Sequence, residues 1–194
     1  MYDKDYYIDS TVSNYVDYTK RNFTDIADDI IKVMKLTHRS NVLDYGCATG
    51  GLVKALRDKH INAFGMDISE WAIQYGQENF GLTDYINTID NMDVHTFVDN
   101  VTCLDVLEHM TLTDIIKLLG SIRADKMLVR IPISNKEGND YTLEVSRNDE
   151  SHMPAHSRTW WVAMFGSFGF DYFKSVTTSN MYDTKGVMVG IFIR

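Results

Sequence analysis

A short segment in the first third of the chain constrains the fold more than any other. Asn41 to Tyr45 is an apolar run that stops at Gly46, so it predicts a buried strand. Positions 46–51 then read Gly-Cys-Ala-Thr-Gly-Gly, and from Gly50 to Lys59 the apolar residues share one helical face. Gly46 can adopt backbone angles that are closed to other residues. The free N–H groups of a helix that starts just after such a turn attract negative charge, so the segment predicts a ligand site.

Strand and helix patterns alternate along the rest of the chain. The strands are expected at 63–66, 85–89, 100–106, 126–133, 172–177 and 187–193, and the helices at 11–36, 50–59, after Ser69, from Thr111 or Thr113 to Leu119, and at 157–168. This alternation predicts an α/β, Rossmann-like fold: a seven-stranded, mostly parallel sheet with helices on both faces. The last two strands follow each other without a helix, which indicates an antiparallel C-terminal hairpin at one edge.

Composition narrows the class of protein. A chain of 194 residues with 44% hydrophobic residues suits a single domain, 1–194. The net charge of -8 argues against a nucleic-acid partner, because an acidic surface repels phosphate. Cys47 and Cys103 form no CxxC pair, and neither a leader segment nor a bilayer-length apolar run is visible. We therefore expect a cytoplasmic protein with reduced thiols and no membrane partner.

The position of Asp44 separates two interpretations of the turn. Gly46, Ala48 and Gly51 match the G-x-A-x-x-G variant of a dinucleotide fingerprint, which would indicate an NAD-dependent oxidoreductase. Asp44, however, ends the strand two positions before the first glycine. A carboxylate there would repel a pyrophosphate and suits a ligand that carries an ammonium and a sulfonium group. No room remains for a separate substrate domain either.

The run Asp44-x-Gly46-x-Ala48-x-Gly50 resembles the first motif of class I S-adenosylmethionine-dependent methyltransferases, (D/E)-x-G-x-G-x-G, with alanine in place of the middle glycine. The resemblance is strongest from 41 to about 110, and a weaker similarity returns from 150 to 170. It implies S-adenosylmethionine as cofactor and S-adenosylhomocysteine as product. It also implies that these four residues line the cofactor site.

The same resemblance assigns further cofactor residues. Asp67 ends the second strand, where it would hold the ribose hydroxyls, and Ile68 would pack on the adenine. After the third strand, Asp90 would contact the adenine amine with backbone help from Asn91, and Asp93 is the substitute. The next strand ends in Asp-Val-Leu-Glu-His, close to the family pattern, which places Leu104 or its neighbour Asp105 toward cofactor or substrate.

Three histidines are the candidates for acid–base catalysis: His152, His109 and His156. They follow strands or lie in loops, where catalytic groups gather. The stretch 149–161 partly matches the "D-P-T-H … S … W" pattern of small-molecule methyltransferases. His109 has a structural alternative at a strand–helix corner, and His156 has one as a helix-capping residue. No metal site is expected, because Pro154 prevents a helix that would align His152 with His156.

The acceptor and the terminal segment stay open. An aromatic N-terminal segment, 1–36, is expected to be helical and to act as a lid, with a helix fixed on the sheet or a dimer contact as alternatives. The insert 134–156 is polar and expected to be mobile. The favoured function is methyl transfer to an O or N atom of a small-molecule acceptor. The alternatives are a non-catalytic S-adenosylmethionine-binding partner and, less favoured, the NAD-dependent oxidoreductase. The oligomeric state stays open, and a homodimer is compatible with the sequence.

Overall fold

A computed structural model describes residues 2–9, 13, 17–89 and 98–194 of the chain. The chain divides into two compact units, 1–94 and 95–194. Each unit has its own strands and helices. Among the described helices, none has both the length and the apolarity needed to span a bilayer.

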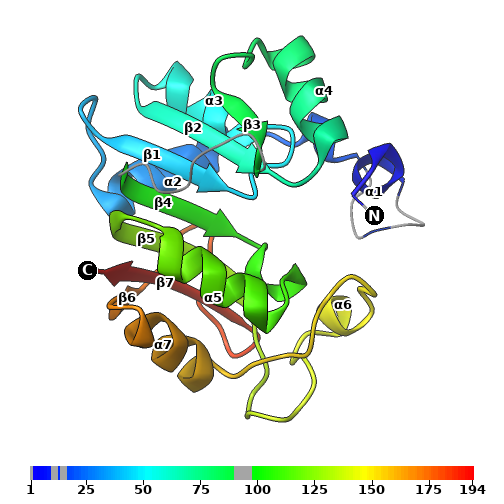
Figure 1. Ribbon diagram of the computed structural model, residues 1–194, viewed down its shortest axis with the longest axis vertical. Coiled ribbons are helices and arrows are strands. Elements are labelled where there is room, and N and C mark those ends of the chain that lie inside the picture. The colour runs from blue at the N-terminus through cyan, green and yellow to red at the C-terminus, as the bar shows by residue number, and fades with distance from the viewer. Residues whose placement is uncertain (1, 10–12, 14–16, 90–97) are drawn as a thin grey trace. The chain divides into compact units, whose positions relative to one another are not determined.

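The first unit contains a parallel three-stranded portion of sheet with helices beside it (Figure 1). Its elements are α1 (Lys4–Ile8), η1 (Tyr18–Lys20), α2 (Thr24–Met34), β1 (Asn41–Tyr45), α3 (Gly51–Asp58), β2 (Asn62–Asp67), α4 (Glu70–Phe80) and β3 (Ile86–Thr88). β2 pairs with β1 on one side and with β3 on the other. Helix α2 packs on α3, and both contribute fully buried side chains such as Ile30 and Leu56.

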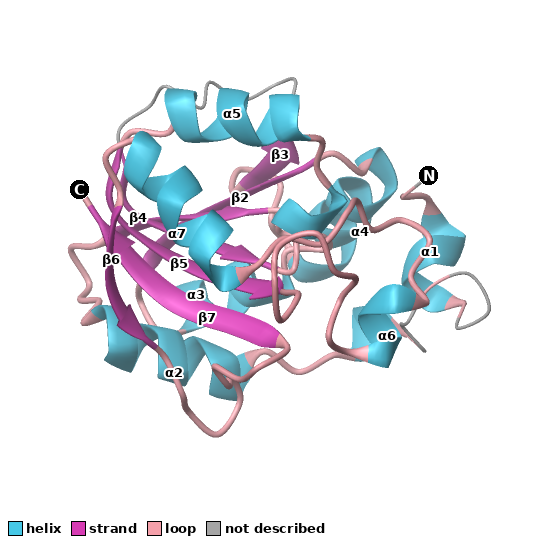
Figure 2. Cartoon of the chain, turned by 90° about the horizontal axis from the view of Figure 1, so that it is seen from below, coloured by secondary structure: helices cyan, strands magenta, loops and turns pink. Residues whose placement is uncertain are grey.

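The second unit ends in an antiparallel pair. Its elements are β4 (Val98–Leu104), η3 (Leu107–His109), α5 (Leu112–Ser121), β5 (Ala124–Pro132), α6 (Glu144–Arg147), α7 (Arg158–Ser167), β6 (Asp171–Ser175) and β7 (Val187–Ile193). β4 and β5 are parallel, whereas β7 is antiparallel to both β5 and β6. Figure 2 shows α5 and α7 alongside these strands. The buried rings of Phe165 and Phe192 stack at 4.2 Å and join α7 to β7.

The strand order is β3-β2-β1-β4-β5-β7-β6 in one seven-stranded sheet. This confirms the expected Rossmann-like α/β class, with its mostly parallel strands and its antiparallel pair at the C-terminal edge. The last strand along the chain, β7, lies between β5 and β6 and is therefore not itself the edge. Its burial agrees with this place, because residues 188–192 are all buried, whereas β6 alternates exposed and half-buried positions.

The observed bounds follow the sequence patterns closely, with three differences. The third strand is shorter than expected, covering only Ile86–Thr88. The α-helix expected at 11–36 is found at Thr24–Met34, and α6 was not anticipated. Helix α6 has four residues, which is too short for a helical repeat to be visible. Helix α6 lies in the insert that was expected to be mobile, and the neighbouring Tyr141 is buried there.

The start of α5 offers a simple test of local stability. Thr111 is its N-cap residue, and the Thr111 hydroxyl accepts a hydrogen bond from the Asp114 N–H at 3.2 Å. We expect Thr111→Ala to lower the free energy of unfolding by about 1 kcal/mol, because the Asp114 N–H loses its side-chain acceptor. Thr113→Ala, an exposed change in the first turn, is the matched control and should change it by less than about 0.5 kcal/mol. Equal effects of the two changes in urea unfolding would contradict this account of the cap.

Candidate functional site

The turn after β1 is held by backbone hydrogen bonds to β2. The N–H groups of Gly46 and Cys47 both donate to the Met66 carbonyl oxygen, at 2.8 and 3.0 Å. Gly46 and Gly50 have φ angles of 78° and 75°, in the left-handed region that glycine tolerates. Ala48, which stands where the family motif has its middle glycine, also lies in the left-handed region, with a φ angle of 50°. The turn therefore reaches α3 without a side-chain cap.

Asp67 joins this turn to the start of α4. One of its carboxylate oxygens accepts from the Ala48 N–H at 2.8 Å, and the other accepts from the Ser69 N–H at 2.8 Å. Burial raises the pKa of the Asp67 carboxyl, and these backbone donors partly offset the rise. The Ser69 hydroxyl caps α4 as the sequence predicted, because it accepts from the Ala72 N–H at 3.1 Å. Asp67 is thus a fixed, buried acceptor at the carboxyl end of β2.

The N-terminal segment packs on the same corner of the first unit. Tyr6 and Tyr7 of α1 form a buried apolar cluster with Ala48 and Ala72. The Tyr7 ring stacks on Trp71 with centroids 5.5 Å apart. Burial, together with the nearby Asp67 carboxylate, raises the pKa of the Tyr7 hydroxyl. The aromatic residues at 2–8 therefore cover part of the turn, as either a lid or a fixed helix would.

Two further side chains of this corner have no partner among the described residues that accounts for their place. Ile68 follows Asp67 directly and is 67% exposed, the largest exposure among the large apolar residues described. An apolar side chain beside a buried carboxylate can pack on a base while the carboxylate accepts ribose hydroxyls. Thr49, in the turn, is 1% exposed, and its hydroxyl has no hydrogen-bond partner. The residues present therefore fit S-adenosylmethionine.

The other expected cofactor residues have mixed outcomes. Asp44 is buried at the end of β1, 5% exposed. Asp90 and Asn91, like the substitute Asp93, lie outside the described residues. Leu104 ends β4 in the second unit and is partly buried. These assignments remain predictions.

In the second unit, β4 ends in a strained corner. Asp105 has a φ of 57°, which is unusual for a residue with a side chain. Its carboxylate is held by the Arg130 guanidinium, whose Nε lies 2.8 and 3.0 Å from the two carboxylate oxygens. This bidentate pair stabilises the turn into η3. Asp105 is therefore already engaged by a side chain of β5.

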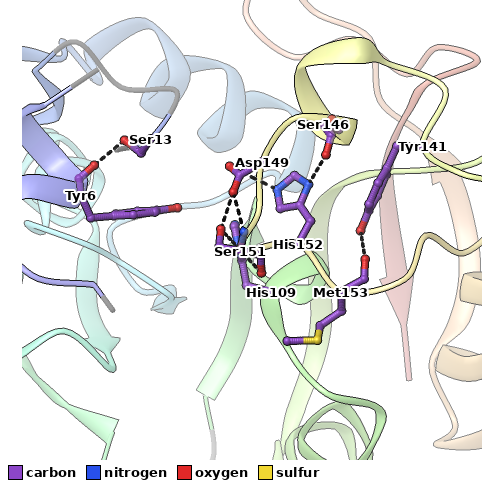
Figure 3. A network of polar contacts seen from close by, with 9 residues as sticks. All are labelled: Tyr6, Ser13, His109, Tyr141, Ser146, Asp149, Ser151, His152 and Met153. Atoms are coloured by element: carbon purple, nitrogen blue, oxygen red, sulfur yellow. Dashed lines mark hydrogen bonds and ion pairs between the residues drawn. The ribbon is translucent and has the colours of Figure 1, made fainter. Parts of the chain in front are cut away.

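The corner brings His109 together with His152. Their ring centroids are 4.6 Å apart, although the two residues come from different loops (Figure 3). The Nδ1 atom of His109 lies 3.0 Å from the Ser151 hydroxyl, and that of His152 lies 2.9 Å from the Ser146 carbonyl oxygen. Burial, reinforced by the neighbouring His152, lowers the pKa of His109. The two imidazole rings form the centre of this group.

Two carboxylates complete the group, and neither was selected from the sequence. Glu108 is only 3% exposed, and its Oε2 atom has no hydrogen-bond partner. Burial, reinforced by Asp105, raises the pKa of Glu108 well above its usual range. Asp149 lies 3.7 Å from His152 Nε2 and accepts a hydrogen bond from the Ser151 N–H at 3.0 Å. The signal available for Glu108 was its place directly before a histidine at a strand end.

His156 has different neighbours. Its Nδ1 atom pairs with Glu137 at 2.7 Å, and its ring stacks on Trp160 at 3.6 Å. Glu137 also accepts from the Ser157 N–H at 2.8 Å, and the Ser157 hydroxyl caps α7. The cap of α7 is therefore Ser157, and His156 contacts this end of the helix through Glu137 and Trp160. Trp161 is buried in the same place.

Comparison with known proteins gives a family. The model of the methyltransferase domain family matches residues 18–175. No curated protein sequence matches the chain significantly.

Solved structures resemble the chain over most of its length. The PH0226 protein from Pyrococcus horikoshii OT3 has a TM-score of 0.68 at 17% identity, with 100% of this chain and 99% of that chain covered. A SAM-dependent methyltransferase from Archaeoglobus fulgidus has a TM-score of 0.62 at 13% identity, covering 87% and 93%. The magnesium protoporphyrin IX methyltransferase of Synechocystis PCC 6803, solved with bound SAH, has a TM-score of 0.60 at 19% identity, covering 88% and 82%. At these identities the likeness shows a shared fold.

Proposed function

Because the chain belongs to the methyltransferase domain family, we propose that it transfers a methyl group to an O or N atom of a small-molecule acceptor. The class of enzyme and the cofactor are those of the family: an S-adenosylmethionine-dependent methyltransferase. The acceptor class is our own inference. It depends chiefly on one observation, the pairing of His109 with His152 beside two carboxylates.

The first unit supplies the groups that hold the cofactor. Asp67 offers carboxylate oxygens for the ribose, Ile68 offers an apolar surface for the adenine, and the turn 46–50 places backbone close to the ligand. We also propose that the segment 1–36 closes this site, as its packing on Ala48 supports. When bound, the cofactor supplies an electrophilic methyl group on a sulfonium.

The histidine group of the second unit suits the acceptor. An attacking hydroxyl or amine forms the new bond to the methyl carbon while the C–S electrons return to sulfur, and the acceptor must lose a proton. A neutral histidine is the usual base for this proton. Each of the two rings has its Nδ1 atom beside an oxygen of Ser151 or Ser146, which leaves Nε2 as the basic position. Ligands of open α/β sheets bind beyond the carboxyl ends of the strands, and His109 follows the end of β4.

Charge and cysteines support the remaining parts of the proposal. The net charge of -8 disfavours a nucleic-acid acceptor. Cys47 and Cys103 are both buried and form no disulfide, which agrees with a reducing compartment, and we propose a cytoplasmic location.

A labelled-methyl assay tests the acceptor class. The protein is incubated with methyl-labelled S-adenosylmethionine and panels of small hydroxylated compounds, small amines, and RNA and DNA oligonucleotides. We expect label in at least one small molecule and none in the oligonucleotides. With that acceptor, His152→Gln should lower kcat by about 100-fold or more, since it removes a group that assists proton loss. The affinity for S-adenosylmethionine should stay unchanged. Label found only in nucleic acid or protein would contradict the proposal.

A further inference from the structure

Three potential ligand atoms converge in the second unit. Glu108, His109 and His152 each offer one such atom, and these atoms all lie within 4.8 Å of one another. Glu108 and His109 belong to η3, which follows β4, whereas His152 comes from the loop before α7. The Glu108 carbonyl oxygen accepts from the Met153 N–H at 2.7 Å, so a backbone hydrogen bond holds the two segments together.

Hydrogen bonds determine which nitrogen of each histidine is protonated. The Ser146 carbonyl oxygen is an acceptor only, so the Nδ1 atom of His152, 2.9 Å away, must donate to it. The Ser151 hydroxyl donates to Asp149, which leaves it an acceptor toward His109 Nδ1 at 3.0 Å. The Ser151 carbonyl oxygen, 3.4 Å from the same atom, is a second acceptor. When either ring is neutral, therefore, its Nε2 atom carries the lone pair.

When Glu108 is ionised, Glu108 Oε2 and His152 Nε2 are both acceptors and cannot satisfy each other. Oε2 of Glu108 is buried without a hydrogen-bond partner. His152 Nε2 lies 3.7 Å from a carboxylate oxygen of Asp149, which is also an acceptor. A buried acceptor without a donor costs free energy. A cation bound among these atoms would satisfy them together.

We propose that Glu108, His109 and His152 bind a divalent first-row transition-metal ion, with the Asp149 carboxylate beside it. Two imidazoles and a carboxylate are donors that manganese, cobalt and zinc accept, whereas magnesium prefers oxygen alone. Ligands about 2.1 Å from an ion lie at most about 4.2 Å apart, so the group must contract by roughly half an ångström. Ser151 and Ser146 orient the two rings through Nδ1, as second-layer partners of metal-bound histidines commonly do.

This inference departs from the sequence prediction of no metal. That prediction considered His152 with His156, which Pro154 separates, whereas the structure pairs His152 with His109. The catalytic part of the inference rests on the proposed function. There, a bound ion would occupy the two Nε2 atoms and take the place of the histidine base: as a Lewis acid it would lower the pKa of an acceptor hydroxyl, whose proton passes to solvent.

Metal binding can be measured without any acceptor. The full chain is stripped with a chelator and titrated with manganese, zinc or magnesium chloride by calorimetry, and the manganese form is studied by pulsed electron paramagnetic resonance. We expect one manganese or zinc ion per chain, weaker magnesium binding, and coupling of the manganese spin to imidazole nitrogen. Glu108→Gln and His152→Ala should each weaken manganese binding by about 100-fold or more. His38→Ala, at an exposed histidine in the other unit, should bind as the unchanged protein does.

Each contrary result has a distinct meaning. The absence of stoichiometric manganese or zinc, or a manganese signal without nitrogen coupling, overturns the metal site. Unchanged affinity in both variants does so too. Thermal melting shows whether the variants fold, and if neither folds, the nitrogen coupling of the unchanged protein decides. S-adenosylmethionine binding is measured on the same sample. If S-adenosylmethionine binds but no ion does, only the metal site is overturned. If S-adenosylmethionine does not bind either, the result also counts against the proposed function.

Discussion

Asp67→Ala is expected to weaken S-adenosylmethionine binding by about 100-fold or more. The change removes the acceptor for the ribose hydroxyls, and hydrogen bonds to a charged group are worth about 1.5–3 kcal/mol each. It also releases the Ala48 N–H, to which Asp67 is bonded at 2.8 Å, so the turn after β1 loses a fixed point. Calorimetric titration of both proteins gives the ratio of affinities.

Two further variants make this prediction specific. Asp84→Ala removes an exposed carboxylate of the same unit and should leave the affinity unchanged. Asp67→Asn keeps the shape of the side chain but only one acceptor oxygen, so its affinity should fall between those of the alanine variant and the unchanged protein. If the folded alanine variant bound within about threefold of the unchanged protein, the cofactor site would have to lie elsewhere.

Gly76→Ala is expected to cost about 2–3 kcal/mol of folding stability, as overpacking commonly does. A Cβ atom at this position of α4 would lie 2.2 Å from the Thr49 carbonyl oxygen and 2.7 Å from Ile86 Cδ1. The first atom belongs to the backbone of the cofactor turn and cannot rotate away. The turn or α4 must therefore shift, so S-adenosylmethionine binding should also weaken, by about tenfold. Thermal melting should show a fall of roughly 5–10 °C.

Gly166→Ala is the matched control. Gly166 lies in helix α7, is exposed, and would have no atom within 4 Å of an added Cβ. Alanine favours helices over glycine by up to about 1 kcal/mol, so this variant should be as stable as the unchanged protein or slightly more stable. A Gly76→Ala protein that melts with the control would show that α4 does not pack closely on the turn.

Much of the fold was predictable because its signals are local. The apolar run at 41–45 and the small residues after it define a buried strand and a tight turn, and both were found. Ser69 caps α4 as its position indicated, because a cap depends only on residues within one turn. The place of β7 between β5 and β6 was not predicted, since it depends on pairing across the sheet.

The candidate site was predictable only in part, for the same reason. Asp67 follows a recognisable strand end, so its position could be inferred. Glu108 could not be placed beside His152, because the two residues lie far apart in the sequence. Asp149 lies three positions before His152, but no local pattern indicates that its carboxylate approaches the ring. The pairing of His109 with His152 likewise arises from the path of the loop before α7. Tertiary contacts, rather than local patterns, assemble this group.

Calorimetric titration of the unchanged protein with S-adenosylmethionine, S-adenosylhomocysteine and NAD tests the proposed cofactor site. We expect the first two to bind at one site per chain and NAD not to bind, because Asp44 is buried at the end of β1 next to the turn. Binding of NAD without either of the other two would contradict it.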